Sequence, residues 1–157
     1  MAAIYQGNES STASLHLPNW FLEMVNGPPG ESPIFVFELC ASILMVCISL
    51  SWPRDQHRTR VLCVDNKAAV AALVKGNSTS KIGSLLTTLF RNLADRGTAT
   101  WRVEYVHTKS NRADQPSRNC SADHERKCTP SNGQCLQTSL CTFKSWGALR
   151  KAATTAQ

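Results

Sequence analysis

The longest apolar stretch of the chain is IFVFELCASILMVCISLSW, which covers residues 34–52 and contains one charged residue, Glu38. Its length suits a single membrane-spanning helix, for which about 20 apolar residues suffice. It equally suits a helix buried between a sheet and other helices, because such a helix is apolar on nearly all sides. The pattern of the remaining chain has to separate these two structures.

Three segments after this stretch have clear patterns. Residues 61–64 (VLCV) are all apolar, which is typical of a central strand buried on both faces. Residues 67–76 consist mostly of helix formers and end at Gly76, so we expect a helix with a glycine C-cap. Residues 100–107 alternate between apolar and polar side chains, which predicts another strand.

The most regular helical pattern lies over residues 81–97. Apolar side chains recur there at steps of three and four and form one stripe (Ile82, Leu85, Leu86, Leu89, Phe90, Leu93). Ser80 precedes the stripe in the position of an N-cap, and Gly97 follows its end. We therefore expect an amphipathic helix in this segment.

Shorter elements are weakly marked. AAIYQ (2–6) and SLHLPNWFLEMV (14–25) each fit a strand, and the Gly and Pro residues of 26–33 indicate a loop before the apolar stretch. Residues 111–118 begin a short helix or turn after the last strand. Strands and helices that alternate along a chain in this way predict an α/β layered domain.

We place this domain over residues 34–118, after weakly patterned strands and a loop over residues 1–33. Residues 119–157 are polar and have no sustained period, which predicts a disordered tail that contains four cysteines.

Charge is divided unevenly along the chain. All 17 Lys and Arg residues lie after residue 53, where 7 acids accompany them, so that part has a net charge of +10. Clustered basic side chains gain affinity for a polyanion by releasing its counterions, although a solvated basic surface without a ligand has the same composition. The charge is therefore compatible with nucleic acid as a partner but does not by itself identify one.

The seven cysteines form two groups. Cys40, Cys47 and Cys63 lie in apolar runs, and we expect them in the core. The others lie in the tail at spacings of eight, seven and six residues (Cys120, Cys128, Cys135, Cys141). Because no pair has the short spacing of a zinc knuckle or ribbon, we expect no structural zinc. Our default expectation is a reduced intracellular protein, in the cytoplasm or nucleus.

Three carboxylates fall at informative places: Glu38 on the apolar stretch, Asp65 directly after the strand at 61–64, and Asp114 after the last strand. Acids that converge at strand ends repel one another unless a cation joins them, and their oxygen atoms suit Mg²⁺ or Mn²⁺. Two such ions can activate water and stabilise the leaving oxygen of a phosphodiester. Each acid alone also fits a simpler role in a turn or at a helix start.

Motifs around these acids appear in order between residues 30 and 118. They are IFVFELCA at 34–41, DNKAAVAALVKG at 65–76 and WRVEYVHTKSNRADQPSR at 101–118. Together they resemble the ribonuclease H-like region that follows reverse transcriptase in DIRS-type and gypsy-type retroelements. The resemblance implies a mixed sheet flanked by helices and metal-dependent cleavage of the RNA strand of RNA–DNA hybrids.

The resemblance also implies roles for individual residues. Glu38, Asp65 and Asp114 are the implied catalytic and metal ligands for Mg²⁺ or Mn²⁺, and His107 and Asn111 are implied auxiliary residues. The candidate contacts to nucleic acid are polar or basic (Asn66, Lys67, Lys109, Arg118). We expect no small-molecule cofactor.

One feature of the family is absent from this sequence. The family has a fourth carboxylate, an Asp on the first strand, but here no Asp precedes residue 55, and the surroundings of Glu9 do not match. We therefore expect a ribonuclease H-like domain truncated before that strand, with weakened metal binding and little or no cleavage. Such a domain would still bind nucleic acid through its basic side chains but would not cleave it.

The competing hypothesis is a single-pass membrane protein with its span at residues 34–52. Ten strongly apolar residues contribute roughly −3 to −6 kcal/mol to insertion, against a penalty for Glu38 of less than about 3.5 kcal/mol. The basic residues near the stretch all follow it (Arg54, Arg58, Arg60), which would place the C-terminus inside. We favour the buried helix because the downstream sheet needs a helix to cover it.

Overall fold

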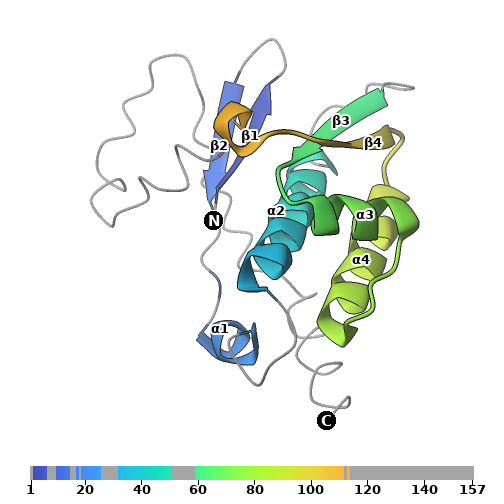
Figure 1. Cartoon of the computed structure of the whole chain (residues 1–157). Helices are drawn as coiled ribbons and strands as arrows, with labels where there is room; N and C mark the ends of the chain where they lie inside the picture. The colour runs from blue at the N-terminus through green and yellow to red at the C-terminus, as the bar shows by residue number, and fades with distance from the viewer. Residues whose placement is uncertain are drawn as a thin grey trace.

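The computed structural model describes residues 2–6, 10–14, 17, 19–25, 32–50, 59–111 and 113. Its elements follow one another as β1 (Ala2–Gln6), β2 (Ser10–Ser14), α1 (Asn19–Val25), α2 (Pro33–Leu50), β3 (Thr59–Val64), α3 (Lys67–Lys75), α4 (Lys81–Ala94), β4 (Thr100–Tyr105) and the 3-10 helix η1 (Thr108–Ser110) (Figure 1). The described part of the chain is therefore mixed α/β, as the sequence predicts.

The described strands form two separate sheets of two strands each. β1 and β2 pair as an antiparallel hairpin, whereas β3 and β4 are parallel neighbours. Parallel strands need a crossover connection, and α3 and α4 supply it on one face of the β3–β4 pair (Figure 1). The sequence resemblance implies a single mixed sheet, but among the described residues the two sheets do not pair with each other.

The core forms around α2. Eleven of its 18 residues are buried, and they lie on several sides of the helix because α3, α4 and both sheets contact it. The hydroxyls of its two buried serines donate to carbonyls of the same helix: Ser42 Oγ to Glu38 at 2.8 Å and Ser49 Oγ to Val46 at 2.7 Å. Neither hydroxyl therefore opposes the burial of this helix.

The length and composition of α2 also meet the requirement for crossing a membrane, and it is the one described helix that does. More than half of its residues are buried inside the fold. A core helix of a soluble protein meets the same requirement, so the helix by itself does not separate the two hypotheses.

Local sequence sets the ends of α3 and α4. Asn66 Oδ1 accepts from the Ala69 N–H at 3.0 Å at the start of α3, and Gly76 ends the helix in the left-handed conformation with φ of 76°. Ser80 Oγ accepts from the Gly83 N–H at 2.8 Å at the start of α4. The predicted caps at Gly76 and Ser80 are thus confirmed.

The prediction that residues 61–64 are buried on both faces is wrong. Leu62 and Val64 are buried, but the Val61 side chain is 52% exposed and Cys63 is exposed. The cause is that α2, α3 and α4 all lie on the same face of the β3–β4 pair, and no other described helix or strand covers the opposite face (Figure 1). Of the three cysteines expected in the core, Cys40 is buried and Cys47 half-buried, but the expectation is wrong for Cys63.

The N-terminal predictions succeed in part. The strand at 2–6 is confirmed as β1, but 14–25 contains the helix α1 instead of a strand. Phe21 and Val25 are buried four residues apart, the spacing at which side chains share one face of a helix. The β2 strand is absent from the predicted elements.

Two segments lie largely or wholly outside the described residues. Of 111–118, where a short helix or turn is expected, the structure describes residues 111 and 113, and η1 comes just before them. The expected tail over 119–157 lies entirely outside, with its four cysteines.

Candidate functional site

Asp65 and His107 lie just beyond the carboxyl ends of two adjacent parallel strands. Val64 pairs with Tyr105, and the Val106 N–H continues the pairing by donating to the Val64 carbonyl at 3.0 Å. Asp65 is half-buried there, and His107 is exposed. The carboxyl ends of parallel strands are where open α/β sheets place their ligands.

Glu38 lies toward the same end of the molecule. At the other end, Arg60 Nη1 donates to the Ser49 carbonyl at 3.0 Å and joins the last turn of α2 to the start of β3. From this contact α2 and β3 run in opposite directions (Figure 1). Along α2 the rise from Ser49 to Glu38 is about 16 Å, and along β3 the rise from Arg60 to Asp65 is also about 16 Å. Because the helix and the strand are antiparallel, Glu38 and Asp65 lie at the same end of the α2–β3 pair.

Asn66 is the N-cap residue of α3. Its side-chain carbonyl caps α3, so its NH₂ group is what remains for a ligand. Because Asn66 supplies the cap, the carboxylate of Asp65 is not needed for it. The helix cap that the Asp65-Asn66 pair allows is thus confirmed, with Asn66 as the capping residue, and the metal-binding role of Asp65 stays a prediction.

The segment after β4 turns back through two side-chain contacts. His107 Nδ1 accepts from the Lys109 N–H at 3.3 Å, which leaves Nε2 to carry the proton of the neutral ring. Asn111 Oδ1 accepts from the Ala113 N–H at 3.1 Å, the pattern of an Asx-turn. Asn111 thus holds the backbone of Ala113 in place. Asp114 and Arg118 themselves lie outside the described residues.

Lys67 has a partner that sequence reasoning missed. Its Nζ atom lies 5.3 Å from the centroid of the Tyr105 ring, which is 44% exposed. A cation over an aromatic ring at an exposed site contributes about 0.5–1 kcal/mol. The sequence places Tyr105 in the strand predicted at 100–107, and Lys67 three residues after the strand predicted at 61–64. That the two side chains meet requires the strand register, which only the structure shows.

The predicted metal site is not complete among the described residues, because its third acid, Asp114, lies outside them. Among them, no group of three or more His, Cys, Asp or Glu side chains is close enough to hold a metal ion. Mg²⁺ is commonly held by one or two carboxylates and several waters, so Glu38 and Asp65 have suitable chemistry. The third predicted ligand is Asp114, and the predicted Mg²⁺ or Mn²⁺ site stays a prediction.

Comparison of the chain with models of protein families, with curated protein sequences and with solved structures found no match.

Proposed function

We propose that this chain is a ribonuclease H-like nucleic-acid-binding domain related to those of retroelement reverse transcriptases. Its ancestral reaction is metal-dependent cleavage of RNA in RNA–DNA hybrids, carried out in the cytoplasm or nucleus. The observation that carries the proposal is the position of Asp65 at the carboxyl end of β3, beside the parallel strand β4, with Glu38 on the antiparallel helix α2.

In this proposal the acids and the basic side chains have separate roles. Glu38, Asp65 and Asp114 hold Mg²⁺ or Mn²⁺, which supplies activated water and charge neutralisation when bound. His107 and Asn111 assist at the same end of the sheet. The residues proposed to contact the nucleic-acid backbone surround them (Asn66, Lys67, Lys109, Arg118).

We expect little or no cleavage by this chain alone. Neither of the first two strands, AAIYQ (2–6) and SSTAS (10–14), contains a carboxylate, so neither can supply a fourth acid to the site. A metal held by three acids instead of four has less compensating charge, which lowers its affinity.

A hybrid-binding and cleavage assay on the purified chain tests the proposal, with Asp65→Asn as the matched control. We expect binding of an RNA–DNA hybrid that weakens steeply with salt, and turnover no higher than that of Asp65→Asn in Mg²⁺ or Mn²⁺. Turnover that Asp65→Asn abolishes would contradict the expected inactivity while supporting the site. Absence of hybrid binding would contradict the function.

A second candidate function is a single-pass membrane anchor, which the length and apolar composition of α2 favour. Alkaline extraction of membranes from expressing cells separates the two. A nucleic-acid-binding domain is released into the supernatant, whereas a spanning protein stays in the pellet.

A further inference from the structure

One side of α3 is exposed along its whole length and has a regular composition. We call this side the α3 stripe (Lys67, Ala68, Ala71, Val74, Lys75). All five residues are exposed, and the Val74 side chain is 61% exposed. Two lysines thus lie at the ends of the helix, about 12 Å apart along its axis, and only small or apolar side chains lie between them.

Folding alone does not explain this composition. The opposite side of α3 holds the residues that join the core (Ala69, Ala72, Leu73). The stripe contributes nothing to that contact. Lys67 also occupies the first position of the helix, whose first turn contains no acid, although the helix dipole favours an acid and disfavours a base there.

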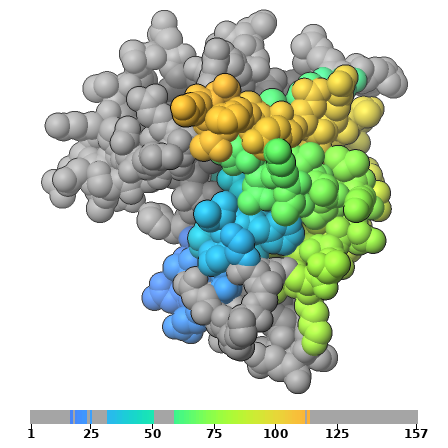
Figure 2. Space-filling view, in the orientation of Figure 1, coloured from blue at the N-terminus to red at the C-terminus, as the bar shows by residue number. Residues whose placement is uncertain are grey.

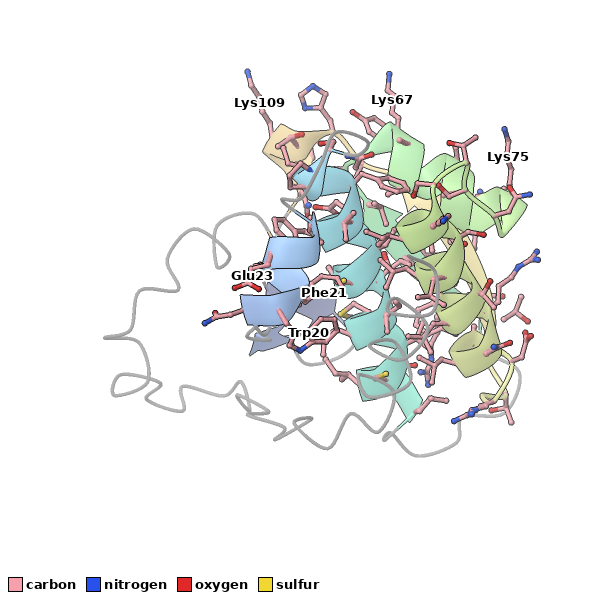
Figure 3. The ribbon with its side chains drawn as sticks, turned by 90° about the horizontal axis from the view of Figure 1, so that it is seen from below. Trp20, Phe21, Glu23, Lys67, Lys75 and Lys109 are labelled. Atoms are coloured by element: carbon pink, nitrogen blue, oxygen red, sulfur yellow. The ribbon has the colours of Figure 1, made fainter. Side chains whose placement is uncertain are left out.

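The charge around the stripe suits an anionic partner. Residues 59–111 contain eight basic and three acidic side chains. One of these acids, Glu104, is paired with Arg102 at 2.6 Å, and none of the three lies in the stripe. Lys67, Lys75 and Lys109 project from one edge of the molecule (Figure 3), and the residues of α3 and η1 lie next to each other on the face shown in Figure 2.

We propose that the α3 stripe lies against the backbone of a nucleic-acid duplex, with Lys67 and Lys75 each contacting a phosphate. This inference rests on the proposed function and adds to it the surface that contacts the duplex. The small side chains between the lysines allow the helix backbone to approach the duplex closely.

The stripe fits a duplex better than a single strand. Single-strand sites combine a basic groove with aromatic side chains on which bases stack, and the stripe contains no aromatic residue. Tyr105 lies beside the stripe, and its ring is in contact with the Lys67 ammonium. A duplex can be recognised through phosphate positions and groove shape without stacking.

Fluorescence anisotropy with the full chain and a labelled RNA–DNA hybrid, measured across a salt series, tests the inference. For Lys67→Gln/Lys75→Gln we expect the slope of log affinity against log salt to fall in magnitude by about 2, since each phosphate contact contributes about 0.9. Lys67→Arg/Lys75→Arg keeps both charges and should retain the slope. Ala71→Glu places a negative charge in the middle of the stripe and should weaken hybrid binding at least tenfold.

The control for net charge is Arg96→Gln, which removes an exposed cation that follows α4 and lies outside the stripe. We expect its slope to change by less than a quarter as much as that of Lys67→Gln/Lys75→Gln. Circular dichroism of each variant confirms that it is folded. If the native chain binds the hybrid and Lys67→Gln/Lys75→Gln binds it with the same affinity and salt slope, the inference is overturned and the proposed function stays intact. Tighter binding of a single strand than of the hybrid would overturn the duplex assignment, and no binding of either would overturn both.

Discussion

Arg60 joins three elements of the fold, so its replacement by Met should destabilise the protein clearly. Its Nη1 atom donates to the Ser49 carbonyl at 3.0 Å, and its guanidinium carbon lies 5.9 Å from the Trp101 ring centroid. The last turn of α2 has no basic residue of its own, so Arg60 supplies the positive charge that a helix C-terminus favours. Arg60→Met keeps an apolar stem and removes both interactions.

The expected loss is about 2 kcal/mol. A hydrogen bond with a charged donor contributes roughly 1.5–3 kcal/mol and a cation–π contact about 0.5–1 kcal/mol, and we take the low end because Arg60 is only half-buried. The assay is urea denaturation of Arg60→Met and the native chain, followed by circular dichroism. For a domain of roughly 100 residues, 2 kcal/mol lowers Tm by about 8–16 °C.

Arg60→Lys is the matched control, because it keeps the charge but replaces the planar guanidinium by a point charge. We expect it to lie between Arg60→Met and the native chain. A free energy of unfolding for Arg60→Met within about 0.5 kcal/mol of the native value would refute the contribution assigned to these contacts.

Further predictions concern glycines and cysteines. Gly76→Ala should lower the free energy of unfolding by about 1–2 kcal/mol, because φ at this residue is 76°; an unchanged value in denaturation would contradict the left-handed cap. Gly83→Ala should cost about 1–3 kcal/mol, because a Cβ atom would lie 2.9 Å from Phe35 Cε1 in the contact between α4 and α2; an unchanged Tm would argue against this packing. Burial raises the pKa of the Cys40 thiol to about 12, so its contribution to stability is complete below pH 9 and is lost as the pH rises toward 12, by up to about 1.4 kcal/mol per pH unit. Cys40→Ala should therefore flatten the fall of stability over this range, and an equally steep fall would contradict the assignment. Alkylation of the folded chain at pH 8, mapped by mass spectrometry, should modify Cys63 and leave Cys40 unmodified, and the reverse order would contradict their burial.

The parts of the fold that follow from the sequence are those with local causes. Ser80 and Gly76 end their helices through contacts with residues three or four positions away, so their roles are visible in the sequence. The exposure of Cys63 has a distant cause. Four apolar residues in a row look the same whether one face of a strand is covered or both, and only the placement of the helices on one face decides it.

In the candidate site, too, some features follow from local sequence and others depend on the fold. The positions of Glu38 on a helix and Asp65 after a strand follow from short patterns, and the structure places both at one end of the α2–β3 pair. The contact of Lys67 with Tyr105 joins residues that are far apart in the sequence, and it depends on the parallel register of β3 and β4. The register depends on how both strands bury their apolar side chains, so neither segment alone shows the contact.

The most direct test of the proposed site is an NMR titration of the full chain with Mn²⁺, whose paramagnetism broadens signals of nearby nuclei even when binding is weak. If Glu38, Asp65 and Asp114 share a cation, the amide signals of residues 65–67, of the α2 turn around Glu38 and of the segment after His107 should broaden together, and Asp65→Asn should abolish the effect. Broadening that appears instead around Asp95 and Glu104, or that persists in Asp65→Asn, would contradict the site.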